Sequence, residues 1–184
     1  MHHLLTAIVV LLAAAPVSAA DLRIDAVRSR AEFSVRLLWV STVTGSFEGI
    51  RGQLAIDPAA HTAVVSADID TESVRMDSAR FRRWVLAPEF FDAERHPQIH
   101  FESSPLPLPL LSEGGDVAGR LTLRGVTRPV TFHLEANDCR TQALAGCVLQ
   151  LKGSIDRTDF DMRGRRGALS DRVNLGMAIV LTSP

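Results

Sequence analysis

Apolar and polar positions alternate along most of the chain after residue 20, the period-two pattern of strands with one buried face. The clearest case is 31–37, where every odd-numbered residue is apolar and every even-numbered residue is polar. A longer strand is predicted over 45–57, and its glycines at 49 and 52 fit the bends that a closing barrel needs. Further strands are predicted over 63–70, 98–102, 116–123, 129–135, 147–155 and 172–181. About eight short strands without a βαβ rhythm indicate an all-β antiparallel barrel or sandwich, and we predict the barrel.

One segment, at about residues 78–86, has a helical period instead. Phe81, Trp84 and Val85 fall at i, i+3 and i+4, which places them on one helix face. Asp77 or Ser78 can cap the start, and Pro88 ends the segment. A single short helix in an all-β chain predicts a lid or plug at a barrel mouth.

Two connections have recognisable chemistry. Residues 124–127 (RGVT) join two predicted strands and fit a hairpin turn. The Pro-rich stretch 104–115 (SPLPLPLLSEGG) fits an extended surface connection. Its leucines could instead cover one end of the barrel, so both interpretations stay open.

Residues 1–20 have the layout of a cleaved secretory signal peptide, with an apolar run followed by a small-residue cleavage site. The run is too short to cross a bilayer as a helix. We therefore expect a periplasmic protein in which residues 21–184 form a single domain. Cys139 and Cys147 are the only cysteines, and an even pair in an exported chain predicts a disulfide.

The formal net charge of −1 argues against a nucleic-acid-binding protein, which normally carries a strongly basic face. Arginines do cluster locally at 163–166, around Gly164. This cluster could meet an anionic head group or could simply keep a loop tip in water.

The sequence contains few candidate residues for an enzyme active site. Glu89, Asp92 and His96 lie close in sequence, but nearby arginines explain the carboxylates as exposed ion pairs. His96 and His100 with Glu94 invite a metal site, yet Pro97 interrupts the strand geometry that would align them. We predict no catalytic residues, no bound metal and no enzymatic activity.

The apolar interior is the main functional candidate, because an eight-stranded barrel is either filled by its side chains or holds one small ligand. The pattern alone does not separate these two states. If a tunnel exists, alternation phase assigns its wall to Phe33, Val35, Leu37, Phe47, Val65, Ile69, Trp84, Phe101, Leu121, Leu123, Phe132 and Leu175.

Several motifs together resemble the YceI-like family over essentially the whole chain after residue 20. They are Phe33-x5-Trp39-x-Ser41-x-Val43-x-Gly45-x-Phe47, Pro88-Glu89-Phe90-Phe91-Asp92, His96-Pro97-x-Ile99-x-Phe101-x-Ser103, Gly119-x-Leu121-Thr122-Leu123-x-Gly125-Val126-Thr127-x-Pro129-Val130, and Arg157-x-Asp159-Phe160 with the closing Val173-x-Leu175 strand. The resemblance implies an extended lipocalin-like barrel of eight antiparallel strands with one short helix. It also implies a carrier of a long isoprenoid or similar amphiphilic lipid, with no cofactor beyond such a bound isoprenoid or quinone-type lipid.

Two departures from the family pattern affect the expected head-group preference. Leu37 and Leu38 stand where many relatives place a His before the Leu. The helix reads FRRWVL where relatives often have an Arg-Asp-x-x-Leu run.

Three functions follow as hypotheses. The leading one is a periplasmic lipid carrier, with an amphiphilic lipid as partner and without nucleic acid. The others are a stress-related module with a packed core and a hydrolase or isomerase using Glu89, Asp92 and His96. Transient membrane contact and a homodimer through an exposed strand edge remain open.

Overall fold

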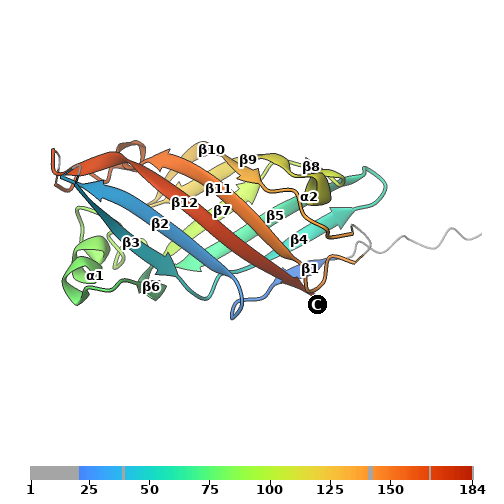
Figure 1. The fold of residues 1–184 in the computed structure, drawn as a ribbon, viewed down its shortest axis with the longest axis horizontal. Coiled ribbons are helices and arrows are strands. Elements are labelled where there is room, and N and C mark those ends of the chain that lie inside the picture. The colour runs from blue at the N-terminus through green and yellow to red at the C-terminus, as the bar shows by residue number, and fades with distance from the viewer. Residues whose placement is uncertain (1–20, 39, 141–142, 166, 184) are drawn as a thin grey trace, which may run out of the picture.

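The computed structural model describes residues 21–38, 40–140, 143–165 and 167–183. The predicted signal peptide and Trp39 lie outside this part of the chain. Within it, one antiparallel sheet curls into an elongated barrel with α1 at one end and α2 at the other (Figure 1). The strands are β1 (Leu22–Ile24), β2 (Arg30–Leu37), β3 (Ser41–Phe47), β4 (Arg51–Asp57), β5 (Thr62–Asp70), β6 (Val74–Arg75), β7 (Gln98–Ser103), β8 (Leu106–Pro107), β9 (Gly115–Leu123), β10 (Val126–Leu134), β11 (Val148–Asp156) and β12 (Leu169–Thr182).

The barrel closes through β12, the longest strand. One edge of β12 pairs with β11, and its other edge pairs first with β2 and then with β1. β1 also pairs with β4, while β2 pairs with β3. β1 and β2 therefore act as one interrupted strand, and β3 and β4 act as a second. The result is a closed eight-stranded antiparallel barrel, which confirms the predicted fold class.

The strand predicted over 45–57 is in fact two strands, which is a correction to the sequence interpretation. β3 ends at Phe47 and β4 begins at Arg51, with Gly49 between them at φ +70°. Gly52 has φ +155°, and a Cβ there would lie 2.1 Å from the carbonyl oxygen of Ser66. Only glycine allows β4 to approach β5 this closely.

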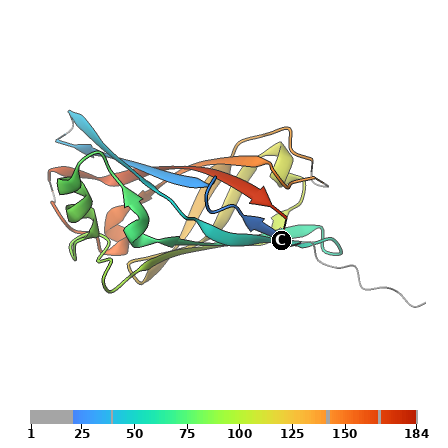
Figure 2. The same ribbon diagram turned by 90° about the horizontal axis from the view of Figure 1, so that it is seen from below.

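Helix α1 (Ala79–Leu86) lies at the predicted position, and the hydroxyl oxygen of Ser78 accepts a hydrogen bond from the N–H of Phe81. It follows the 3₁₀ turn η1 (Thr71–Ser73) and β6, which pairs with the last two residues of β3. Figures 1 and 2 show α1 at the same end of the barrel as the β2–β3 hairpin.

The Pro-rich stretch forms β8 and α2 (Leu110–Glu113), and both Leu106 and Leu111 are buried. Its leucines thus cover one end of the barrel, so the second of the two interpretations is correct.

Near this end, Cys139 and Cys147 form the predicted disulfide. Between β9 and β10 the predicted connection is shorter than expected, because only Arg124 and Gly125 lie outside the strands, both with positive φ.

Candidate ligand cavity and its mouth

The interior of the barrel contains a cavity with an almost entirely apolar wall. Its lining extends from Trp84 and Leu169 at the α1 end to Leu111 and Leu181 at the α2 end. The cavity has a volume of about 220 Å³. Since β12 has 14 residues, each rising about 3.3 Å, such a cavity suits a long, narrow apolar molecule.

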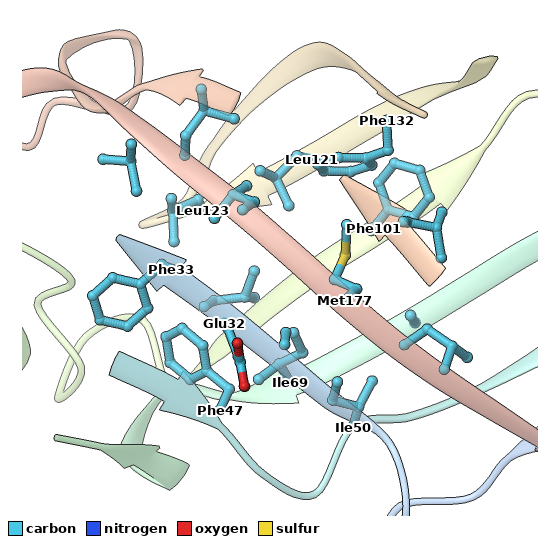
Figure 3. A pocket seen from close by; sticks show the side chains of 18 of the residues that line it. Glu32, Phe33, Phe47, Ile50, Ile69, Phe101, Leu121, Leu123, Phe132 and Met177 are labelled. Atoms are coloured by element: carbon cyan, nitrogen blue, oxygen red, sulfur yellow. The ribbon is translucent and has the colours of Figure 1, made fainter. Parts of the chain in front are cut away.

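All the residues that alternation phase assigns to a tunnel line this cavity. They are Phe33, Val35, Leu37, Phe47, Val65, Ile69, Trp84, Phe101, Leu121, Leu123, Phe132 and Leu175. Figure 3 shows several of them facing the same interior space from different strands. Their role in binding a ligand stays a prediction.

Besides the Phe81–Trp84 pair on α1, aromatic rings form two groups along the wall. Phe33, Phe47 and Phe91 contact one another, with the Phe33 and Phe47 ring centroids 5.7 Å apart. Phe101 and Phe132 meet edge to face at 5.4 Å. The edge-to-face pairs are a favourable arrangement of aromatic rings, and together with the tilted Phe33–Phe47 pair they give the wall a defined shape.

Glycines leave room for three of these rings to lie against the sheet, and a Cβ on Gly153 would lie 2.5 Å from the Phe132 ring. A Cβ on Gly45 would lie 2.4 Å from the Phe33 ring, and one on Gly119 would lie 2.6 Å from the Phe101 ring. The rings occupy space above a bare backbone instead of projecting further into the cavity. The glycines therefore help to keep the cavity open.

At the α1 end, Trp84 is held between two arginines. The guanidinium carbon of Arg165 lies 3.6 Å from the Trp84 ring centroid, and that of Arg80 lies 4.5 Å away. Trp84, Phe81 and Arg165 all line the cavity, although no residue of α1 is fully buried. At this end the lining includes exposed Arg165 and half-buried Trp84, whereas Leu111 and Leu181 at the α2 end are buried, so the cavity opens between α1 and the loop before β12. We call this opening the mouth.

Arg157 fixes the loop that carries Arg165. Its side chain is only 2% exposed and donates hydrogen bonds to the carbonyl oxygens of Ser170, Met162, Gly164 and Leu169. It also donates to the carboxylate of Asp171 at 2.8 Å. One buried guanidinium therefore satisfies several backbone acceptors, and it ties Met162 and Gly164 of the loop to the start of β12.

The turn η2 (Arg157–Phe160) that begins this region is capped by Asp156. The Asp156 carboxylate accepts hydrogen bonds from the hydroxyl and the backbone N–H of Thr158. These two hydrogen bonds, in that order, lower the pKa of Asp156. The cap is therefore charged at neutral pH, as a carboxylate at the start of a helical turn should be.

The residues considered for catalysis or metal binding do not form a site of that kind. Asp92 is buried with one carboxylate oxygen 3.7 Å from Arg95, while Glu89 is exposed. His96 packs over the turn at Gly125, and His100 pairs with Asp68 at 2.8 Å. Among the described residues, no group of three or more His, Cys, Asp or Glu could hold a metal ion.

Sequence reasoning missed the parts that organise the mouth. The sequence shows Arg157 only as part of a family motif, because a buried arginine that hydrogen-bonds to backbone carbonyls produces no periodic pattern. Arg165 was noticed in its cluster, but its contact with Trp84 links residues far apart in sequence. Ile50, Phe91 and Met177 also line the cavity and were not assigned to it.

Comparisons with known proteins agree with this geometry. The sequence model of the YceI-like domain matches residues 22–181. A UPF0312 protein of Pectobacterium carotovorum is 31% identical over 95% of this chain and 93% of its own length. One from Pseudomonas fluorescens is 33% identical over 89% and 87%.

Solved structures share the fold. Burkholderia cenocepacia BcnA superposes with a TM-score of 0.69 at 21% identity, over 87% of this chain and 99% of that one. A polyisoprenoid-binding domain from Saccharophagus degradans, implicated in plant cell wall breakdown, gives 0.65 at 16% identity, over 91% and 100%.

Proposed function

Because the chain belongs to the YceI-like domain family and encloses a long apolar cavity, we propose that it binds an isoprenoid or similar amphiphilic lipid. The cavity wall is the observation that carries the proposal. Apart from Glu32, Gln53, Arg157 and Arg165, its lining is apolar. The Glu32 and Gln53 side chains are exposed, and Arg157 already has its hydrogen-bond partners. An apolar tail in the cavity would therefore contact almost no polar groups.

The physical basis is burial of the tail. Each CH₂ removed from water contributes about 0.8 kcal/mol before the cost of ordering the chain and the side chains around it. Affinity should therefore rise with tail length until the cavity is full. A head group would stay near the mouth, where Trp84 and Arg165 supply a polar rim.

The similarity of fold to a polyisoprenoid-binding domain supports an isoprenoid as the class of tail. The expected signal peptide supports action in the periplasm, where a carrier would shield an insoluble lipid from water. We propose binding and carriage, with no chemical change to the lipid, because the residues around Glu89, Asp92 and His96 form no catalytic arrangement.

The test is a titration with isoprenoid quinones that share one head group and differ in tail length. A matched pair of variants controls for the cavity: Ala67 lines it, whereas Ala118 is exposed on β9. The proposal expects tighter binding of longer tails, loss of binding in Ala67→Phe and unchanged binding in Ala118→Phe. Binding that ignores tail length, or that survives in a folded Ala67→Phe protein, would contradict it.

A further inference from the structure

We propose that the α1 end of the barrel is a docking surface for an anionic lipid bilayer. The docking surface consists of α1, Leu38 and Val40 of the β2–β3 hairpin, and the loop residues 161–165 and 167–168. This inference rests on the proposed function and adds to it the place where cargo would leave or enter a membrane. In the described residues, no helix is both long enough and apolar enough to cross a membrane.

The hairpin tip exposes two apolar side chains. Leu38 is 58% exposed and Val40 is 87% exposed. The tip is held in place, because the Leu38 N–H donates to the Ala168 carbonyl at 2.7 Å and the Val40 N–H donates to the Leu37 carbonyl at 3.3 Å. Two apolar side chains are thus presented beyond the end of the barrel, next to the loop before β12.

Single exposed apolar side chains are common on protein surfaces. The charge of the neighbouring segments therefore decides whether these two mark a membrane-binding site. The connections at this end are 38–40, 71–97, 124–125 and 157–168. They contain seven acidic residues, of which Glu89 lies against Gly164, Asp92 pairs with Arg95 and Asp161 pairs with Arg163. Against these, the described arginines are Arg75, Arg80, Arg82, Arg83, Arg95, Arg124, Arg157, Arg163 and Arg165, so arginines outnumber acidic residues. Arg36 and Arg83 are exposed and form no ion pair within the described part of the chain.

The opposite end carries the opposite charge. Its connecting segments, 57–61, 104–114 and 135–140, contain Asp57, Glu113, Glu135 and Asp138 against only Arg140. A molecule with a net charge of −1 is therefore polarised along its long axis, and an anionic surface would attract it α1 end first.

The same end holds the mouth of the cavity. Leu37 and Leu169, paired across β2 and β12, line the cavity directly behind the hairpin tip. Trp84 and Arg165 line it on the other side of the mouth. Docking in this orientation would bring the apolar wall next to the bilayer, so a tail could pass between them with little exposure to water.

A bilayer fits this surface better than an acidic protein. A stable protein partner needs about 800 Å² of complementary surface on each side. Here the exposed apolar side chains are those of Leu38 and Val40, two residues apart on the β2–β3 hairpin, and the arginines are spread over the surrounding segments. Shallow insertion of the tip with arginines at the head groups is the geometry expected of an interfacial contact.

The experiment is vesicle flotation with protein that starts at Asp21 and so contains every strand of the barrel. Vesicles of phosphatidylglycerol and phosphatidylcholine are compared with vesicles of phosphatidylcholine alone, at low and at physiological salt. Val40→Asp and Arg83→Glu disrupt the surface, and neither residue lines the cavity. Val27→Asp, at a 94% exposed valine between β1 and β2, and Arg120→Glu, at an exposed position of β9, are the matched controls.

We expect salt-sensitive binding to the anionic vesicles only, reduced about tenfold or more by Val40→Asp and Arg83→Glu and unchanged in both controls. All variants should keep the quinone affinity of the unmodified protein in solution. Equal loss in the controls, or failure of the unmodified protein to float, would overturn the docking surface. If the protein floats as expected but binds no quinone in the titration, the docking surface stands and the proposed function fails.

Discussion

The guanidinium carbon of Arg165 lies 3.6 Å from the centre of the Trp84 ring. This contact joins the loop before β12 to helix α1, two segments that the sheet itself does not connect. Because both residues also line the cavity, the contact spans the mouth through which a lipid would pass. A cation–π contact of this kind contributes about 0.5–2 kcal/mol, enough to hold a lid without locking it.

Replacing Arg165 with Ala should therefore speed ligand release several-fold, because α1 loses its link to the loop. Stopped-flow displacement of a bound isoprenoid quinone measures the rate. The melting temperature should change little, since Arg165 is exposed. Arg80→Ala is the matched variant, and its effect should be smaller because Arg80 lies 4.5 Å from the ring. Equal release rates in all three proteins would contradict the idea of a lid.

Arg157 should be far more important for stability than other arginines. Arg157→Lys leaves several buried carbonyls without donors, because one ammonium cannot replace a guanidinium fork that reaches four of them. We expect a loss of about 2–4 kcal/mol in the free energy of unfolding, measured with urea. Arg128→Lys is the control, since exposed Arg128 donates to a single carbonyl of Asp159. A similar small change in both variants would show that the loop does not depend on Arg157.

The disulfide should stabilise the end of the barrel away from α1. Cys139 and Cys147 are eight residues apart, and the loop between them buries Leu144. Replacing both cysteines with serine should lower the free energy of unfolding by about 2.5 kcal/mol in the chain-entropy model. A reducing agent should cause the same loss in the unmodified protein and none in the double variant. Any further loss in the double variant would mean that the reductant acts elsewhere.

Gly45 should control the width of the cavity. A Cβ there would lie 2.4 Å from the Phe33 ring, so Gly45→Ala must push the ring away from the wall. We expect weaker binding of long-tailed quinones, while short-tailed ones are affected less. Gly176→Ala is the matched control on β12, because a Cβ at Gly176 meets nothing within 4 Å. Unchanged binding in Gly45→Ala would show that the ring moves without narrowing the cavity.

Much of this architecture could be predicted because strand alternation is a local signal. Successive residues of a strand face opposite sides of the sheet. Phe33, Val35 and Leu37 therefore point into the barrel, while the polar residues between them point outward, and closing the sheet does not change this alternation. The signal for the start of helix α1 is equally local, since the capping Ser78 and Phe81 are three residues apart. The family motifs then supplied the closure of the barrel, which no single strand encodes.

What escaped prediction depends on short elements and long-range contacts. β1 has only three residues, too few to show a period, yet it completes the sheet between β4 and β12. The break between β3 and β4 was read as a bend within one strand, because glycine signals both. The contact between Arg165 and Trp84 depends on how distant segments meet, which alternation cannot report.

The central claim is that the cavity holds a lipid, and native mass spectrometry of the protein purified from its source cells tests it most directly. Organic extraction of the same sample identifies whatever is released. We predict a discrete added mass that matches an isoprenoid or quinone. A bare mass that stays bare after incubation with quinones and polyprenyl lipids would contradict the claim, and the cavity lining would then be an ordinary core.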